Sequence, residues 1–203
     1  MIAMISSWDQ TILFWIQAQL VNGILSPLML LLSTLGNLGA VWIAAAIGLF
    51  CTKKYRRAGI AVFIALFFSL AVGNGLLKHL VMRARPCMDF PWLPMLVQLP
   101  APNDFSFPSG HTFASFAAAA AMFRVLPRWL GRLAFGLAAG IGFSRVYLCL
   151  HYPSDVLAAA VLGIGFGLLA WRLSAWAAAW LRSEKYPAAA DGQLPEGNHP
   201  ASF

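Results

Sequence analysis

A short polar segment, residues 144–155, carries the residue types in this sequence that are best suited to chemistry. It lies between two long apolar runs and contains His151, with Asp155 four residues later. Pro153 suits the first turn of a helix, because that turn does not use its missing N–H. Asp155 then lies near the positive end of the helix dipole and leans back toward His151. A carboxylate on one imidazole nitrogen fixes the tautomer and leaves the other nitrogen free to attack an electrophile.

A plainer interpretation of His151 and Asp155 is that they cap a membrane helix, since Asp is common near helix starts. Two further segments weigh against it. The second segment, residues 108–112, opens another apolar run with Ser109, Gly110 and His111. Ser109 can act as the helix cap, Gly110 lets an anion approach the backbone, and the free N–H groups of a helix start bind phosphate readily. His111 would point into the same place, although an N-cap beside an interfacial histidine is the simpler alternative.

The third segment supplies positive charge at the end of an apolar run. Lys78 and Arg85 are seven residues apart, which is nearly two helical turns, so we expect both on one face of a helix. Pro86 is expected to stop that helix immediately after Arg85. Arg83 falls off the shared face, and we expect it to meet lipid headgroups or solvent. The alternative for Lys78 and Arg85 is snorkelling toward headgroups.

The composition indicates a membrane protein. Of 203 residues, 60% are hydrophobic and only 10% are charged, and the mean hydropathy is +0.72. Such a chain has too few charges for a soluble domain of this size, so its apolar runs must face lipid. The net charge of +7 is segregated along the chain and therefore indicates topology rather than nucleic-acid binding. The first ten residues lack a basic n-region and a cleavage site, so no removed signal peptide is expected.

The apolar runs predict an all-α, polytopic fold with about six transmembrane helices. These runs cover about residues 10–34, 38–52, 58–82, 109–125, 132–150 and 153–181. The glycines and asparagine at 36–39 indicate a turn, and residues 86–108 are too rich in proline for a long helix. We expect one transmembrane domain over residues 1–182 and a disordered cytoplasmic tail over residues 183–203, where no periodicity is found.

The basic residues orient this arrangement. With six spans and a cytoplasmic N-terminus, most of the 14 basic residues lie in cytoplasmic loops or the tail. The exceptions are Lys78, Arg83, Arg85 and Arg145, which all fall near outer helix ends. Outer loops are ordinarily poor in such residues, so we expect their role to be binding of negative charge. The predicted site therefore faces the extracytoplasmic side of the cell (inner) membrane, with both termini in the cytoplasm.

Small residues and cysteines have mainly structural interpretations. Runs such as Ala117–Ala121, and the glycines at 136, 140, 142, 163, 165 and 167, are expected to let helices approach closely. The three cysteines have no metal-site spacing. Cys87 and Cys149 fall on the same outer side, where either a disulfide or two unpaired apolar thiols would fit.

Together the three segments describe a site for phosphoryl transfer. Three cations, one helix N-terminus and two imidazoles on one membrane face would hold a highly charged oxyanion. Phosphoryl transfer needs this charge stabilisation and an in-line nucleophile, and the cations can replace the usual magnesium. Asp155 is the only acid in the three segments, so no metal site and no cofactor are expected.

At this point the sequence resembles a known family. The three segments match, without a substitution, the tripartite signature of the type 2 phosphatidic acid phosphatases, which share their phosphate pocket with vanadium haloperoxidases. They read Lys78-(six residues)-Arg85-Pro86, Pro108-Ser109-Gly110-His111 and Ser144-Arg145-(five residues)-His151-(three residues)-Asp155. The resemblance covers about residues 20–180. The haloperoxidase branch is soluble, so its activity is not expected here.

The resemblance implies a metal-independent membrane enzyme that hydrolyses a lipid phosphate through a phosphohistidine. It implies that His151 is the nucleophile, that Asp155 orients it, and that His111 protonates the leaving oxygen and then activates water. The phosphoryl oxygens would be held by Lys78, Arg85, Ser109, Gly110 and Arg145.

In its small size, the chain resembles the bacterial members of this family that act on undecaprenyl diphosphate. Phosphatidylglycerophosphate and phosphatidic acid are alternative substrates, and transfer to a lipid acceptor is an alternative reaction. A non-catalytic lipid-binding protein would not need an oriented nucleophile.

Overall fold

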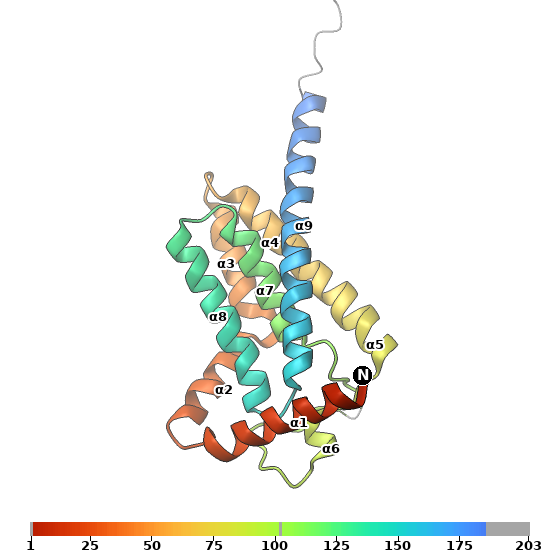
Figure 1. The fold of residues 1–203 in the computed structure, drawn as a ribbon. Coiled ribbons are helices and arrows are strands. Elements are labelled where there is room, and N and C mark those ends of the chain that lie inside the picture. The colour runs from red at the N-terminus through yellow and green to blue at the C-terminus, as the bar shows by residue number, and fades with distance from the viewer. Residues whose placement is uncertain (1, 102, 186–203) are drawn as a thin grey trace, which may run out of the picture.

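The computed structural model describes residues 2–101 and 103–185, and every regular element in them is helical. The all-α prediction is therefore confirmed over this part of the chain (Figure 1). The elements are, in order, α1 (Ile2–Gln19), α2 (Leu25–Leu35), η1 (Asn37–Gly39), α3 (Ala40–Cys51), α4 (Arg56–Phe68), η2 (Ser69–Leu77), α5 (Lys78–Val81), α6 (Pro86–Asp89), α7 (Gly110–Phe123), α8 (Arg128–Tyr147) and α9 (Pro153–Lys185).

Helix α7 lies at the centre of the bundle, against α4, α8 and α9 (Figure 1). Its alanines, Ala117–Ala121, are fully or almost fully buried, because small side chains leave room for neighbouring backbones. A Cβ placed on Gly163 of α9 would come within 2.7 Å of the Phe113 carbonyl oxygen, so α7 and α9 touch along their backbones. The predicted packing role of small residues is confirmed here, whereas Gly136 and Gly165 face open space.

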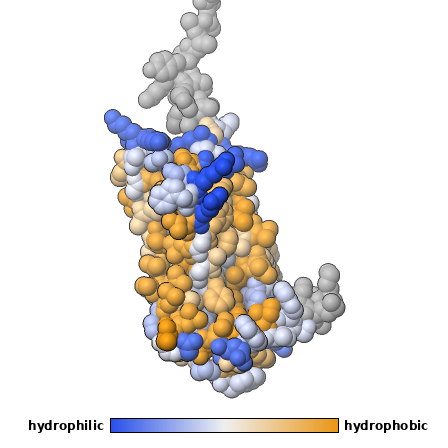
Figure 2. All heavy atoms as spheres, turned by 60° about the vertical axis from the view of Figure 1, so that its left-hand side comes forward, coloured by the Kyte–Doolittle hydropathy of each residue, from blue (hydrophilic) through white to orange (hydrophobic). Residues whose placement is uncertain are grey.

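The outer surface of the bundle is apolar between two polar ends. Figure 2 shows an apolar belt below a strongly hydrophilic upper end, where Figure 1 places the α3–α4 and α7–α8 connections. Among the described residues, two stretches are long and apolar enough to cross a membrane, Arg56–Asp89 and Pro153–Trp176. A third arises if Leu25–Leu35 and Asn37–Cys51, which meet at 51°, form one broken span.

Two boundaries differ from the sequence prediction. The first apolar run, residues 10–34, is divided between α1 and α2, because Asn22 accepts hydrogen bonds from the N–H groups of Ile24 and Leu25 and makes a turn. Residues 183–185 of the expected tail belong to α9, and the rest of that tail, 186–203, lies outside the described residues.

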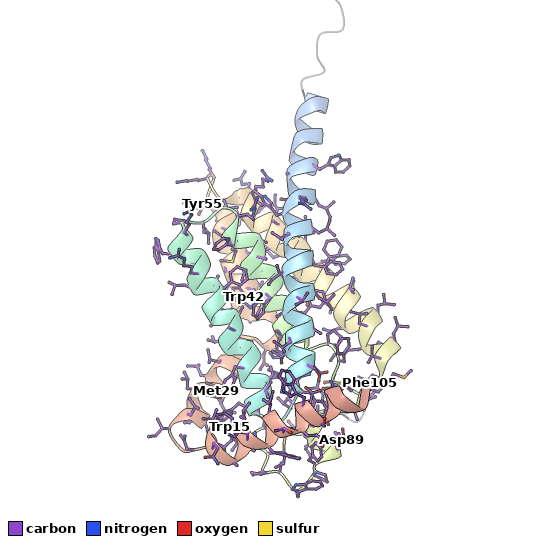
Figure 3. The ribbon with its side chains drawn as sticks, viewed as in Figure 1. Trp15, Met29, Trp42, Tyr55, Asp89 and Phe105 are labelled. Carbon is purple, nitrogen blue, oxygen red and sulfur yellow. The ribbon has the colours of Figure 1, made fainter. Side chains whose placement is uncertain are left out.

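The polar motifs lie at the lower end, opposite the basic connections. Helix α1 runs across this end, beside α2 and α6 (Figure 1). In Figure 3, Trp15, Met29, Asp89 and Phe105 all lie at the lower end, whereas Tyr55 lies at the upper end. The bundle therefore separates one basic end from the end at which the three motif segments meet.

Candidate active site

The three motif segments surround a cavity of about 530 Å³. The predicted site residues that line it are Lys78, Arg85, Gly110, His111, Arg145 and His151. Ser109 and Asp155 have no exposed surface and lie behind this wall. Residues from α5, α7, α8 and the turn before α9 thus come together, although 73 positions separate Lys78 from His151 (151 − 78).

His151 presents one ring nitrogen to the cavity side and the other to the protein interior. Its Nε2 lies 3.2 Å from an Nη of Arg85, and its Nδ1 lies 3.4 Å from Oγ of Ser106. A guanidinium has only donors, so the Nε2 that faces it carries the lone pair and Nδ1 carries the hydrogen. Burial, with the positive charges of Arg85 and Arg145 close by, lowers the pKa of His151 well below its usual value. The imidazole is therefore neutral and nucleophilic at Nε2.

Asp155 contacts His151 through Ser106 rather than directly. The shortest separation between Asp155 Oδ2 and His151 Nδ1 is 3.9 Å, which is too long for a hydrogen bond. Ser106 lies between them and donates to Asp155 Oδ2 at 2.5 Å. The N–H of Tyr152 donates to the same oxygen at 2.9 Å. The expected placement of Asp155 near His151 holds, but its influence passes through a serine that the sequence motifs do not include.

The start of α7 contributes backbone and His111 to the cavity. Ser109 occupies the N-cap position as expected, but its Oγ accepts a hydrogen bond from Thr112 at 2.9 Å instead of capping the backbone. A Cβ on Gly110 would come within 2.7 Å of Asn74 Oδ1, so any other residue here would require the Asn74 side chain to move. The ring of His111 is held by Asn37, whose Oδ1 lies 2.9 Å from Nε2.

Lys78 and Arg85 share one carboxylate, that of Asp104. Lys78 Nζ lies 2.6 Å from Oδ1, and an Nη of Arg85 lies 2.8 Å from Oδ2. Arg85 also donates to the Asp104 carbonyl at 2.7 Å. Burial would raise the pKa of Asp104, but its bonds to Lys78 and Arg85 outweigh this and lower it below the usual value. A carboxylate thus occupies the donors that are expected to hold phosphoryl oxygens.

Two residues that line this cavity also have buried polar atoms without a partner. Among the side chains described, the buried nitrogen and oxygen atoms without a hydrogen-bond partner are Asn74 Oδ1 and Arg145 Nε. Both residues line the cavity. Arg145 is otherwise held by a hydrogen bond to Ser33. Buried polar atoms ordinarily have partners, so two orphans in one cavity indicate a polar ligand.

The prediction for Arg83 is wrong. Helix α5 ends at Val81 because Met82 adopts a left-handed conformation with φ of 47°, and the backbone is extended at Arg85. The helical periodicity used for Arg83 therefore does not apply. Arg83 turns inward, where its guanidinium contacts Asp9 and Asp155, each at 2.6 Å. Pro86 likewise begins α6 and does not end α5.

The three cysteines are free thiols, and both Cys87 and Cys149 are buried. Of the two possibilities left open by the sequence, the structure has unpaired thiols.

Three contributors to the site were missed from the sequence: Ser106, Asp104 and Asn37. Each lies outside the three motifs, and its partner is 45, 26 and 74 residues away respectively. Serines, aspartates and asparagines in proline-rich or glycine-rich loops are ordinary turn residues, so their identity gave no signal.

The comparisons agree with this geometry. A family model described as the PAP2 superfamily matches residues 54–179. Undecaprenyl-diphosphatase of Sulfolobus acidocaldarius is 32% identical over 140 residues. The match covers 68% of this chain and 66% of that protein, which is just under two thirds of its length. Undecaprenyl-diphosphatase BcrC of Bacillus subtilis is 31% identical over 154 residues, covering 75% of this chain and 77% of that protein.

A solved structure is similar over most of the chain. It is the first transmembrane PAP2 type phosphatidylglycerolphosphate phosphatase from Bacillus subtilis, with a TM-score of 0.66 and 26% identity. The match covers 82% of this chain and 84% of that one. The chain therefore belongs to the PAP2 superfamily, as its motifs predicted. Within that superfamily it stands among proteins named as phosphatases.

Proposed function

We propose that this chain hydrolyses a lipid phosphate through a phosphohistidine, and that undecaprenyl diphosphate is the preferred substrate. The observation that carries the proposal is the position of His151, which lines the same cavity as Lys78, Arg85 and Arg145 and has its Nε2 3.2 Å from an Nη of Arg85. Cations placed around a lone pair suit a phosphoryl group, because they neutralise its oxygens while the nitrogen approaches phosphorus.

In the first step, Nε2 of His151 forms a bond to the terminal phosphorus as the bond from that phosphorus to the bridging oxygen breaks. His111, which is protonated beside the bound and negatively charged diphosphate, gives its proton to the departing lipid phosphate. In the second step, His111 takes a proton from water, the water oxygen bonds to phosphorus, and the bond from phosphorus to His151 breaks. Inorganic phosphate leaves and both histidines return to their starting states.

The roles of the other residues follow from their positions. Lys78, Arg85, Arg145 and the N–H groups at Gly110 hold phosphoryl oxygens, and Ser109 fixes the start of α7 beside them. Asp155 stabilises the positive charge that develops on His151, through Ser106. The charge that a magnesium ion would supply is provided by the three cations, so we propose a metal-independent reaction.

A lipid substrate is supported by the shape of the cavity. One wall is apolar and includes residues that are exposed on the surface of the bundle, namely Leu38, Ile43, Phe63, Phe67 and Leu70. These residues belong to η1, α3, α4 and η2, so the phosphate end of the cavity continues into the apolar belt. A chain in the bilayer can lie along this wall while its head group reaches His151. Phosphatidylglycerophosphate and phosphatidic acid fit the same description.

We also propose that the site lies at the extracytoplasmic face of the inner membrane and that the C-terminal end of α9 lies on the cytoplasmic side. The expected six crossings and cytoplasmic N-terminus do not fit α1, which runs across the site end of the bundle and places Asp9 against Arg83 and Ser154. The upper end, which is strongly hydrophilic in Figure 2, holds the lysines and arginines of the α3–α4 and α7–α8 connections, and this supports the orientation. Cysteine labelling from either side of the membrane tests it, with Thr52→Cys and Leu99→Cys made separately in a Cys51→Ser chain, because Cys51 is itself an exposed free thiol. Labelling of Leu99→Cys only from outside is the expected result.

The experiment that tests the reaction is phosphate release by the purified chain from undecaprenyl diphosphate, phosphatidylglycerophosphate and phosphatidic acid. Release from the diphosphate well above the other lipids is expected. A His151→Ala variant, folded to the same extent, should release none. Equal release from all three would refute the substrate preference. Transfer of phosphate to a lipid acceptor, with no free phosphate, would replace hydrolysis by phosphotransfer.

A further inference from the structure

Helix α1 reaches the candidate site through a buried carboxylate, Asp9. Its side chain has no exposed surface. Asp9 accepts hydrogen bonds from Arg83 at 2.6 Å, from the Ser154 hydroxyl at 2.6 Å, and from the Ser154 N–H at 2.8 Å. A buried charge needs such hydrogen-bond partners. Here one partner is Ser154, in the first turn of α9, and the other is Arg83, which also contacts Ser154.

Arg83 connects this carboxylate to Asp155. One Nη of Arg83 contacts Asp9, while the other donates to Asp155 Oδ1 at 2.6 Å and to the Ser154 hydroxyl at 2.8 Å. The guanidinium also lies over the ring of Tyr152, with 4.0 Å to the ring centroid. A planar group bonded on two sides and stacked on a ring has one orientation, and it fixes the oxygen of Asp155 that it contacts.

The line of contacts continues to the nucleophile. Asp155 Oδ1 is taken by Arg83, so Oδ2 is the oxygen directed toward Ser106, which lies 3.4 Å from His151 Nδ1. Rotation of the Asp155 carboxylate would misplace Ser106 and release the Nδ1–H of His151. None of these contacts involves Lys78 or Arg145, which belong to the phosphate-binding side of the cavity.

We propose that Asp9 and Arg83 are positioning residues, which hold Asp155 and Ser106 in the arrangement that aims Nε2 of His151 at phosphorus. The proposal rests on the proposed role of His151. It assigns α1 a part in the reaction, although none of the three sequence motifs lies in that helix. Because these residues act on the nucleophile and not on the bound phosphate, their loss should lower kcat and leave KM nearly unchanged.

The test uses the full chain in lipid nanodiscs, with undecaprenyl diphosphate as substrate. Asp9→Asn keeps the shape but removes the charge that orients Arg83, and Arg83→Lys keeps the charge but removes the fork. Each should lower kcat about tenfold or more, because small displacements of a nucleophile are costly, with KM within about twofold. The double variant should lose no more than the worse single variant, since both act along one line of contacts.

Asp89→Asn is the matched control. Asp89 lies at the same end of the bundle and accepts a hydrogen bond from the Tyr152 hydroxyl at 2.5 Å. It has no bond of its own to Arg83 or Asp155, which Tyr152 contacts through its ring face and its backbone N–H. Its kcat should stay within about twofold of wild type. A kcat that is unchanged in Asp9→Asn, a change confined to KM, or an equal loss in Asp89→Asn would overturn the proposal.

A second readout does not depend on turnover. The ring ¹⁵N chemical shifts of His151, assigned by their loss in His151→Ala, report which nitrogen carries the hydrogen. In Asp9→Asn these shifts should move from the values of the Nδ1–H tautomer toward those of a mixture of the two tautomers. Unchanged shifts would count against a positioning role for Asp9. If wild type releases no phosphate from any lipid while these shifts still move, the proposed reaction fails and the positioning role stands.

Discussion

Asp104 provides the sharpest test of the phosphate site, because its carboxylate holds the same donors that phosphate needs. In the structure it bridges Lys78 Nζ and the guanidinium of Arg85, at 2.6 and 2.8 Å. A phosphoryl group therefore competes with this carboxylate for both cations. Asp104→Asn keeps the size of the side chain and removes the charge, so we expect inorganic phosphate to bind more tightly.

The magnitude follows from the exposure of the three groups. The Asp104 side chain is 41% exposed, so solvent screens both ion pairs, while Lys78 and Arg85 are 15% and 5% exposed. An exposed pair is worth about 0.2–1 kcal/mol, so two such pairs together are worth about 0.4–2 kcal/mol. That free energy corresponds to a decrease of about 2-fold to 30-fold in the inhibition constant of inorganic phosphate.

The assay measures inhibition of lipid phosphate hydrolysis by inorganic phosphate, with Asp89→Asn as the control. The pKa of Asp104 is lowered by its bonds to Lys78 and Arg85, so the carboxylate stays ionised until the pH falls below the usual pKa of an aspartate. The ratio of inhibition constants between wild type and Asp104→Asn should therefore be constant through neutral and mildly acidic pH. It should approach one only in stronger acid. An inhibition constant that is unchanged or higher in Asp104→Asn would refute the competition between carboxylate and phosphate.

Three further predictions concern the same cavity. Arg85→Lys should raise KM about tenfold or more, because the bidentate fork is lost; unchanged KM and kcat would exclude Arg85 as a phosphate ligand. Ser106→Ala should lower kcat about tenfold with little effect on KM, because the link from Asp155 to His151 is cut; a wild-type kcat would show that the serine has no part in it. Incubation with EDTA should leave phosphate release unchanged, because the cations of the site belong to the protein; recovery of a lost activity by added magnesium would contradict the metal-independent reaction.

Much of the site could be predicted because its residues occur in short segments with fixed spacing. His111, His151 and Gly110 line one cavity, as their motifs indicated, and the start of α9 at Pro153 follows from simple rules for proline. Arg85 also lines this cavity, but for a different reason from the one predicted. The helix ends before it, and an extended segment carries it there.

The errors arise where local periodicity gives way to tertiary contacts. A helix that was assumed to continue through Met82 placed Arg83 on the wrong side, and no rule of sequence signals a left-handed methionine. Asp9 and Asp104 could not be found either, because each is an isolated acid whose partners lie far along the chain. The six crossings also depended on unbroken runs, whereas the first run is divided at Asn22.

The contact between α7 and α9 limits which parts of the molecule can change in sequence during evolution. At Gly163 the two helices meet so closely that any side chain would strike the backbone of α7. His111 and Asp155 lie in the first turns of these helices, so the contact sets the spacing of the phosphate site and allows little variation. The wall formed by Phe63 and Phe67 faces outward and has no such constraint. New lipid preferences are therefore expected to arise on that wall, while the chemistry at the histidines stays the same.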